Sequence, residues 1–354
     1  MSTPTARGGT LPVAPPASMR ASVLIRPEHI ETQNRPVPVP RSDEVLVRVS
    51  AVGVCGSDVH FYRDGHLGDW KASDPLVLGH ESGGTIVAVG DATDPGRVGE
   101  RVSIEPQHPS PSSPETLRGD YNLDPHMRFY AVPGTDGAFQ EYVTIQSHFA
   151  HRIPDSVSDH AAALMEPLSV AIATARKACF SPGERVLIAG AGPIGIALVQ
   201  VARAFGVTEV IVSDLAPERR QTALRFGAHV VLDPRATPPP EVSTVDAFVD
   251  ASGADSAVRE GITAVRPGGR VVLVGMGLSE MPLPITIIQN RELIVTGVFR
   301  YANTWPTAIA LVAGGHVDLD AMVTATFGLS EVARALESTA DPSTIKAIVE
   351  PTRP

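Results

Sequence analysis

Three side chains in the first quarter of the chain are of the types that bind zinc at catalytic sites. Cys55 lies in GVCGSDVHFY, and His80 and Glu81 lie in the later segment GHE. A thiolate, an imidazole and a carboxylate suit a catalytic zinc ion, which keeps a further position open for water or substrate. Taken singly, Cys55 reads equally well as a small buried residue and His80 as a core histidine. The set predicts a metal centre if the fold brings the two segments together.

A second carboxylate, Glu166 in MEPLSV, lies in an apolar segment that is expected to start a helix. An unpaired charge buried there would be costly, so Glu166 needs a partner. A cation reached from another part of the chain would supply one, and so would a helix N-terminus or an arginine. The residues alone leave these alternatives open.

Gly190, Gly192 and Gly195 have the spacing of a dinucleotide-binding turn. This G-x-G-x-x-G pattern falls between an expected strand, 185–190, and an expected helix, 194–206. Glycines there let the backbone approach a pyrophosphate at the helix N-terminus. The pattern alone is weak evidence, and its simplest reading is a turn that needs glycines.

An acidic residue in the right place strengthens this interpretation. Asp214 ends the next expected strand, about 20 residues on, where a carboxylate accepts hydrogen bonds from an adenosine ribose and repels a 2′-phosphate. This favours NAD over NADP. Arg219 follows shortly and is placed to cover the adenine, although an arginine near this position also accommodates NADP in some proteins.

The pattern of apolar residues along the chain changes near residue 159. Residues 22–90 hold short alternating apolar runs between Pro and Gly turns, which is typical of a β-rich domain. Residues 107–126 are polar and proline-rich and are expected to form a long surface loop. Residues 159–180 have the apolar spacing of one helix, with Asp159 suited to cap its start. From 185 to 277 expected strands and helices alternate, which predicts βαβ units and a parallel sheet covered on both faces.

The length of 354 residues favours an α/β protein with two domains. Residues 19–168 and 304–354 are expected to form a β-rich domain, with the last segment folding back onto the first. Residues 169–303 are expected to form a doubly wound coenzyme domain. Residues 1–18 are expected to be a mobile tail, because they have no periodicity and no apolar core of a signal peptide.

Composition excludes several classes of function. The formal net charge is −10 and the basic residues are scattered, which argues against nucleic acid and anionic membranes as partners. No apolar run reaches the length of about 18 residues that a transmembrane helix needs. Two cysteines, Cys55 and Cys179, cannot build a disulfide framework, so we expect a cytoplasmic protein.

Five segments, in order, resemble the zinc-dependent medium-chain dehydrogenases, and within them the sorbitol (L-iditol) and xylitol dehydrogenase branch. They are GVCGSDVHFY, GHESGGTIVAVG, EPLSVAI, GAGPIG and GVFRYANTWP. The resemblance runs from about Ala21 to about Val349. It implies a GroES-like catalytic domain, a Rossmann domain for NAD and an active site in the cleft between them. It also implies a tetramer, and the segment PLPITIIQNRELIVTGV is expected to let copies pair edge to edge.

The resemblance implies that Cys55, His80 and Glu81 hold one zinc ion together with a water, with Glu166 beside the metal. In the wider alcohol dehydrogenases the residue at the position of Glu81 does not bind the metal directly, and a cysteine stands at the position of Glu166. The resemblance therefore leaves open whether Glu81 or Glu166 is the third ligand. Asp58 is expected to orient His80 from behind.

Many relatives hold a second, structural zinc with four closely spaced cysteines. The corresponding stretch here, 104–130, has none, so we expect no structural zinc. No role is expected for His66, His108, His126 or His151, of which His66 and His108 are expected to be solvated surface side chains.

The implied mechanism is loss of a proton from a zinc-bound secondary alcohol and transfer of hydride to the nicotinamide. Ser57 is expected to take the hydroxyl proton and His60 to pass it to solvent, with Glu166 as a further catalytic group. Substrate contacts are expected from Phe61, Phe129, Glu166, Arg300 and Tyr301. Phe61 stands where related polyol dehydrogenases often have a tyrosine. The positions expected to line the cofactor are Gly190, Gly192, Pro193, Ile194, Gly195, Asp214, Arg219, Val274, Gly275, Met276, Val298, Phe299 and Arg300.

These expectations predict a dehydrogenase that oxidises a small polyol to a 2-ketose with NAD. The alternative is a related secondary-alcohol dehydrogenase acting on threonine, 2,3-butanediol or a sugar acid such as idonate. A non-catalytic NAD-binding module would keep the glycine turn but would have no reason to keep Cys55, Ser57, His80 and Glu81 together.

Overall fold

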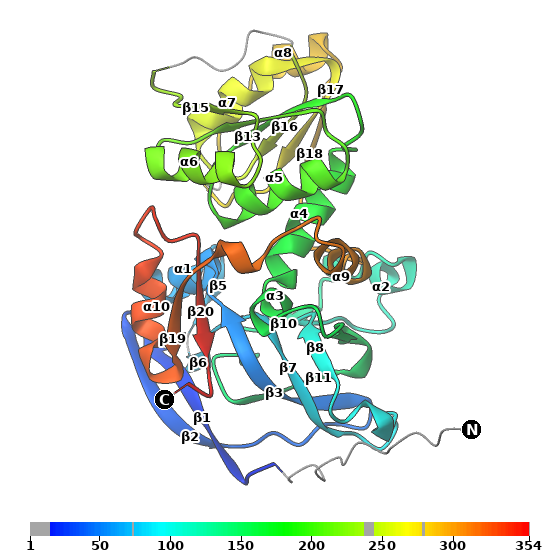
Figure 1. Cartoon of the computed structure of the whole chain (residues 1–354), viewed down its shortest axis with the longest axis vertical. Coiled ribbons are helices and arrows are strands. Elements are labelled where there is room, and N and C mark those ends of the chain that lie inside the picture. Colours follow the sequence, from blue (N-terminus) through cyan, green and yellow to red (C-terminus); the bar gives the residue numbers. More distant parts are fainter. Residues whose placement is uncertain (1–14, 73, 237–243, 278–279, 354) are drawn as a thin grey trace, which may run out of the picture.

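The computed structural model describes residues 15–72, 74–236, 244–277 and 280–353. Two bodies are stacked along the long axis, a parallel sheet with its helices above and a β-rich part below (Figure 1). Helix α4 (Met165–Lys177) lies where the two meet. Of the tail expected over residues 1–18, residues 1–14 lie outside the described residues, and the first strand begins at Ser18.

Six parallel strands form the upper sheet, in the order β15-β14-β13-β16-β17-β18. The strands are β13 (Arg185–Ala189), β14 (Glu209–Ser213), β15 (Val230–Leu232), β16 (Val245–Asp250), β17 (Val265–Leu273) and β18 (Ile294–Gly297). The first strand of this sheet in sequence, β13, lies in its middle, and the later strands are added outward on both sides. This confirms the doubly wound sheet that the alternating sequence predicts.

Helices cover both faces of this sheet. They are α5 (Pro193–Ala204), α6 (Pro217–Arg225), α7 (Asp255–Ala264) and α8 (Ile285–Asn290). Because side chains alternate along a strand, Val186 and Ile188 of β13 pack in one core with α5, whereas Leu187 packs in another with α7. Burial on both sides explains why these strands are continuous apolar runs.

The β-rich part is built around one seven-stranded sheet that contains both early and late segments of the chain. Its strand order is β12-β8-β7-β3-β20-β19, and β11 also pairs with β3. Its strands are β3 (Glu44–Gly53), β7 (Glu81–Val89), β8 (Arg101–Ile104), β11 (Tyr142–Gln146), β12 (Ala150–Arg152), β19 (Val323–Gly328) and β20 (Lys346–Glu350). The last strand, β20, pairs antiparallel with β3, where Ile348 lies opposite Gly53.

Smaller sheets and short helices complete this part. The remaining strands are β1 (Ser18–Arg26), β2 (His29–Pro36), β4 (His66–Leu67), β5 (Trp70–Lys71), β6 (Leu76–Val77), β9 (Gln107–His108) and β10 (Arg128–Phe129). The helices are α1 (Gly56–Asp64), α2 (Pro114–Arg118), α3 (Asp159–Ala163), α9 (Trp305–Ala313) and α10 (Val332–Ser338). Figure 1 shows α9, which follows the upper sheet in sequence, beside the lower part.

The helix expected over 159–180 is two helices, α3 and α4, separated at Leu164, whose ψ of 3° leaves the helical range. Pro167 has no N–H and is tolerated only in the first turn of a helix, so the break suits the sequence. The cap is Ser158, whose Oγ accepts from the N–H of Ala161 at 2.9 Å, and not Asp159.

The surface loop expected over 107–126 is partly ordered into secondary structure. It holds β9 and the short helix α2, which is capped by Ser113 before its first turn and by Gly119 after its last. The expectation that His108 is a solvated side chain is wrong, because it is only 7% exposed and burial lowers its pKa to about 4. Proline content marked this stretch as irregular, but it does not reveal which side chains are covered.

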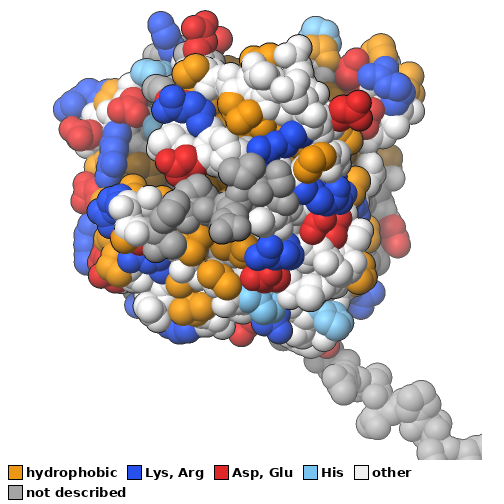
Figure 2. Space-filling view, turned by 90° about the horizontal axis from the view of Figure 1, so that it is seen from above, with side chains coloured by type: hydrophobic (Ala, Val, Ile, Leu, Met, Phe, Trp, Pro, Cys, Tyr) orange, Lys and Arg blue, Asp and Glu red, His pale blue; other side chains and the backbone are white. Residues whose placement is uncertain are grey.

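Charges of both signs are intermingled on the face formed by the upper body. Figure 2 shows acidic, basic and hydrophobic side chains scattered over it without a field of one sign. Among the described residues, no helix combines the length and the apolar composition that a bilayer crossing requires.

Candidate active site

A buried aspartate joins the two segments that carry the candidate metal ligands. Asp58 lies in the first turn of α1 and has no exposed surface. One of its oxygens accepts from the Cys55 N–H at 3.0 Å, and the other accepts from the Gly79 N–H at 2.9 Å. Its Oδ1 also lies 3.6 Å from Nδ1 of His80. The carboxylate thus holds both loops in place, which supports the orienting role expected for Asp58.

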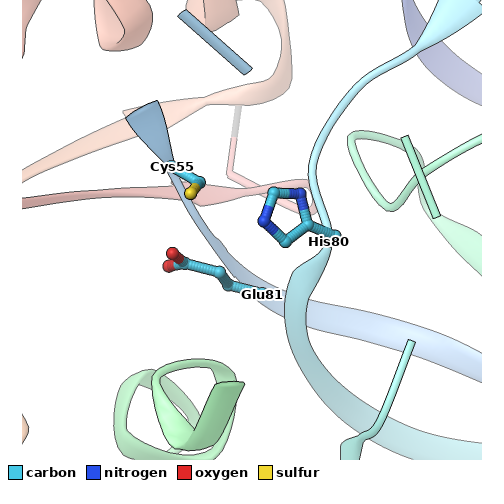
Figure 3. A group of neighbouring side chains, drawn as sticks. All are labelled: Cys55, His80 and Glu81. Carbon is cyan, nitrogen blue, oxygen red and sulfur yellow. The ribbon is translucent and has the colours of Figure 1, made fainter. Parts of the chain in front are cut away.

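Cys55, His80 and Glu81 converge on one point. One ligand atom from each lies within 4.8 Å of the others, and Figure 3 shows the three side chains pointing toward one another. His80 and Glu81 are buried, and Cys55 is partly so. Sulfur, nitrogen and oxygen donors in this arrangement fit zinc. Among the described residues, no other group of at least three His, Cys, Asp or Glu side chains converges in this way.

The electrostatics of His80 follow from its neighbours. Burial lowers the pKa of the imidazole, but the carboxylate of Asp58 and the Cys55 sulfur outweigh burial, and the net shift of the pKa is upward. A positive charge is therefore favourable at this position, as a bound cation would be.

Glu81 is held by a buried cation from the last strand. Nζ of Lys346 donates to both carboxylate oxygens of Glu81, 2.6 Å from Oε2, and to the carbonyl of Val54 at 2.8 Å. Neither side chain of the pair is more than 2% exposed. Burial lowers the pKa of Lys346, but Glu81 and Cys55 outweigh it and the net shift is upward, so Lys346 is a charged ammonium.

The carboxylate of Glu81 also requires a glycine on the neighbouring strand. A Cβ at Gly53 would stand 2.0 Å from Oε2 of Glu81 and 3.0 Å from the side chain of Leu164. Neither neighbour has room to withdraw, because both are fully buried. Gly53 is therefore required by a close approach and not by its backbone angles.

Glu166 lies beside this cluster, with a different partner from those expected. Its Oε1 accepts from the hydroxyl of Tyr301 at 2.7 Å, and both side chains are buried. Burial raises the pKa of Glu166 to about 7; His80 opposes this shift, whereas Glu81 adds to it. No ion pair joins Glu166 to Arg300 within the part of the chain that the structure describes.

Arg300 is surrounded by aromatic rings. Its guanidinium carbon lies 3.9 Å from the ring centre of Phe129, 4.7 Å from that of Phe299 and 5.6 Å from that of Trp70. The residue adopts φ 55°, a backbone conformation that costs energy in a residue with a side chain. Burial lowers the pKa of Arg300, with Tyr301 and Glu166 opposing it. Its N–H groups donate to no described residue, so they remain available for a ligand.

A cavity of about 610 Å³ opens at the carboxyl ends of the parallel strands, where doubly wound sheets bind ligands. Gly190, Gly192, Asp214 and Arg219 line it. No atom lies within 4 Å of the place where a Cβ of Gly192 would stand, which leaves room for a phosphate at the start of α5.

The other glycine of the turn packs the helix against the strand. A Cβ on Gly195 would stand 1.9 Å from the carbonyl oxygen of Gly190, whose φ is 96°. Asp214 accepts from the N–H groups of Ala191 at 2.7 Å and Ala216 at 2.8 Å, which fixes its carboxylate at the cavity. These features fit a dinucleotide.

Comparison with known proteins places these features in a family. Residues 41–155 match the family model of the alcohol dehydrogenase GroES-like domain, and residues 193–314 match that of zinc-binding dehydrogenases. Sorbitol dehydrogenase of Bacillus subtilis (strain 168) is 38% identical over 330 residues, which cover 91% of this chain and 94% of the relative. The chain belongs to the zinc-dependent medium-chain dehydrogenases, in the sorbitol dehydrogenase branch.

Solved structures agree with the dehydrogenase fold. A short chain alcohol dehydrogenase from Escherichia coli CFT073, complexed with NADH, superposes with a TM-score of 0.88 at 29% identity, covering 95% of this chain and all of that one. L-idonate 5-dehydrogenase from Escherichia coli superposes with a TM-score of 0.89 at 26% identity, covering 94% and 98%.

Three further residues that the sequence assigned to catalysis or substrate binding differ in how far they are exposed. Ser57 lies in the first turn of α1 and is partly buried. His60 is about half exposed, with Nδ1 3.2 Å from Oδ2 of Asp64. Phe61 is 1% exposed and packs in the core of the β-rich part. The roles assigned to these residues stay predictions.

The predicted cofactor positions beyond the glycine turn follow the ends of two neighbouring strands. Three of them follow β17 and three follow β18, at the edge of the sheet where the cavity opens. They are Val274, Gly275, Met276, Val298, Phe299 and Arg300. Pro193 and Ile194 open α5, next to the cavity. Their contacts with NAD stay predictions.

Sequence reasoning missed Lys346, Gly53 and Trp70. A lysine directly before the apolar run AIV of β20 was a usable signal of a buried cation, although not of its partner. Trp70, on the β4-β5 hairpin, is 40% exposed and reaches Arg300 from far along the chain. No local pattern indicates that contact.

The raised pKa of Glu166 predicts a pH-dependent stability in the zinc-free protein. The folded protein binds this proton more tightly than the unfolded chain, where the pKa is near 4.5. The stabilisation is therefore complete below pH 4.5 and is lost as the pH rises through about 7. Relative to Glu166→Gln, the wild type should lose about 3 kcal/mol of unfolding free energy over this range.

Urea unfolding of chelator-treated wild type and Glu166→Gln at several pH values measures this difference. The exposed Glu218 supplies the control, since Glu218→Gln should give a difference that hardly varies with pH. A flat difference for Glu166→Gln as well would contradict the burial argument.

Proposed function

We propose that this chain moves a hydride from a secondary hydroxyl of a polyol, such as sorbitol or xylitol, to NAD and so forms a 2-ketose. The observation that carries the proposal is the convergence of Cys55, His80 and Glu81 on one point. The sequence similarity of the chain to sorbitol dehydrogenases, which extends over most of its length, supports the substrate class.

Cys55, His80 and Glu81 hold the zinc ion in this proposal, with Glu166 beside it. Bound zinc supplies a Lewis acid that makes a substrate hydroxyl more acidic. Lys346 contacts the carboxylate of Glu81, and that carboxylate converges with Cys55 and His80, which favours Glu81 over Glu166 as third ligand. Glu166 is held beside the cluster by the hydroxyl of Tyr301, which donates to its Oε1 at 2.7 Å.

Ser57 and His60 carry the proton away from the substrate in this proposal. Ser57 lies at the start of α1 two residues after Cys55, so its hydroxyl is near the reacting alcohol. The half-exposed ring of His60 suits exchange of that proton with solvent. Arg300 and Tyr301 bind the other hydroxyls, with Phe129 and Phe61 as apolar walls.

The cofactor site is proposed at the 610 Å³ cavity and the neighbouring strand ends. NAD bound there would supply its nicotinamide ring as the hydride acceptor. Gly190, Gly192 and the start of α5 contact the pyrophosphate, and Asp214 and Arg219 contact the adenosine. The carboxylate of Asp214 disfavours the 2′-phosphate of NADP.

A sugar acid is the second candidate substrate. Arg300 has free N–H groups in a partly desolvated position, which would suit a carboxylate as well as hydroxyls. The structural likeness to L-idonate 5-dehydrogenase supports this alternative. Threonine and 2,3-butanediol remain further possibilities within the same chemistry.

We further propose the domain limits 19–168 with 304–354 for catalysis and 169–303 for NAD. The sheet membership of β19 and β20 supports the first, and that of β13 to β18 supports the second. The cytoplasm is the proposed location, supported by the two free cysteines and the use of NAD.

A tetramer assembled from dimers is the proposed assembly. Strand β18 lies at the edge of the parallel sheet, and Ile294 on it is 60% exposed. An exposed apolar edge strand invites pairing with a second copy.

Zinc and substrate dependence test the activity directly. NADH formation is followed with xylitol, sorbitol, ribitol, galactitol, 2,3-butanediol, idonate and threonine. We expect the highest turnover with a polyol, loss of turnover after chelation and recovery with zinc. A folded, zinc-loaded protein that turns over idonate or threonine but no polyol would overturn the polyol assignment and leave the dehydrogenase standing.

Arg300→Ala tests the hydroxyl contacts. Loss of charge-assisted hydrogen bonds should lower kcat/KM for the best polyol about tenfold to hundredfold, and much less for 2,3-butanediol, which has fewer hydroxyls to bind. Arg259→Ala, at an exposed ion pair on α7, is the control and should change neither value. Equal losses for both substrates would argue against a role in binding the additional hydroxyls.

Ile294→Lys tests the edge strand. A charge at this edge should convert the wild-type assembly into smaller species in sedimentation velocity. Val39, 85% exposed on the β-rich part, supplies Val39→Lys as the control, which should leave the assembly intact. An unchanged sedimentation coefficient for Ile294→Lys would place the interface elsewhere.

A further inference from the structure

A two-stranded ribbon lies under the loop that carries Arg300 and Tyr301. In β9 and β10, Gln107 is paired with Phe129, and His108 is paired with Arg128. Directly paired residues of an antiparallel ribbon share a face. Phe129 contacts the guanidinium of Arg300, so Gln107 is on the face that looks toward the active site.

Gln107 fastens the backbone of this loop. Its side chain is fully buried, and Nε2 donates to the carbonyl oxygen of Tyr301 at 3.0 Å and to Oε1 of Glu105 at 3.0 Å. The Tyr301 carbonyl and the Glu105 carboxylate are both acceptors only. Position 107 therefore requires a side chain whose end carries two N–H donors on one nitrogen. The amide of glutamine meets that requirement, whereas glutamate and leucine do not.

Glu105 anchors the other end of this link. It is 1% exposed and accepts three hydrogen bonds, from Gln107, from the hydroxyl of Tyr121 at 2.7 Å and from Nε2 of His151 at 2.9 Å. The oxygen of Tyr121 in turn accepts from the N–H of Asn303 at 2.7 Å. A buried carboxylate with three donors is a rigid anchor, because losing any donor leaves a buried charge short of a partner.

The held loop has an unfavourable backbone geometry. Arg300 adopts a φ of 55°, which a residue of this size populates only where surrounding contacts impose it, and Asn303 adopts a φ of 56°, which asparagine tolerates more readily. Gln107 bonds the residue after Arg300, which is Tyr301, and the hydroxyl of Tyr301 contacts Glu166. The bond from Gln107 therefore opposes relaxation of the segment that aims both side chains.

We propose that Gln107 is a positioning residue that holds the Arg300–Tyr301 loop in its substrate-binding conformation. The proposal rests on the proposed function, since it assigns to Gln107 the aim of two residues that bind the polyol there. Gln107 acts on substrate affinity and specificity through the loop and touches neither the metal cluster nor the NAD cavity. Its removal should raise KM for the polyol more than it lowers kcat.

Kinetics of the zinc-loaded enzyme with sorbitol, or with the polyol of highest turnover, provide the first test. Gln107→Leu should lower kcat/KM for the polyol about tenfold. The affinity for NADH, measured by fluorescence titration, should fall less than the affinity for the polyol, because Gly190, Gly192 and Asp214 of the proposed cofactor site lie outside this loop. Gln107→Met keeps the length of the side chain and serves if the leucine variant does not fold.

A double-mutant cycle with Arg300→Ala separates positioning from general damage. If Gln107 acts through the loop, Gln107→Leu should have a smaller effect in the Arg300→Ala background than in the wild type, because only the part that acts through Tyr301 remains. Gln200 supplies the matched control, because it is a buried glutamine that accepts from the N–H of Asp318 at 2.7 Å, outside the site. Gln200→Leu should leave kcat/KM unchanged. A full additional loss from Gln107→Leu in the Arg300→Ala background would overturn the proposal.

Hydrogen exchange provides a readout that does not depend on the substrate. Amides of the peptide 298–305 should exchange faster in Gln107→Leu than in the wild type or in Gln200→Leu. Unchanged exchange in this peptide would overturn the positioning role even if every polyol were turned over. Faster exchange in a protein without polyol activity would instead leave the positioning role standing and refute only the substrate class.

Discussion

The burial of a carboxylate at Glu81 is the constraint on which the architecture of the site depends. A carboxylate without exposed surface requires a cation, and Lys346 supplies it from the last strand of the chain. Removing one partner of such a pair typically costs about 3–5 kcal/mol, because the other charge is left buried. The chain must therefore complete the parallel sheet and return to β3 before the metal cluster is electrostatically complete.

Asp58 plays the corresponding part on the other side of the cluster. Its two oxygens are used by the N–H groups of Cys55 and Gly79, so the thiol and the imidazole are set by backbone contacts and not only by their own rotamers. Glu81 and His80 are adjacent in sequence, which means that the pair with Lys346 and the bonds to Asp58 act on one rigid corner at the start of β7. The geometry of a metal site depends on such supporting contacts as much as on its ligands.

Sequence alone predicted the elements whose signals are local. The glycine turn at Gly190, the carboxylate at Asp214 and the alternation of strands and helices all follow from periodicity and turn chemistry, and the structure has them where expected. The contacts that complete the site are not local. Glu81 and Lys346 are 265 positions apart, and their pairing depends on a strand order that periodicity does not encode.

The incorrect sequence predictions also concern features that depend on contacts between distant segments. Polarity suggested a solvated loop around His108, but burial depends on what packs over a segment and not on its own composition. The hydrophobic period favoured one helix across Leu164, although Pro167 already carried the information that a helix must restart nearby. The motif GVFRYANTWP, which pointed to Arg300 and Tyr301, could not indicate Trp70, because Trp70 contacts the guanidinium of Arg300 from the separate β4-β5 hairpin.

The segment 104–130 has no cysteine, so its shape must come from other interactions. Glu105 supplies one centre of order, with donors from three separate places in the sequence. A carboxylate differs from a tetrathiolate metal site in one respect that matters for the loop above it. The thiolates of such a site bind the metal ion itself, whereas Glu105 accepts from three side chains, and the amide of Gln107 that donates to it also donates to the carbonyl of Tyr301. Order in this lobe and the aim of the substrate loop therefore depend on the same amide.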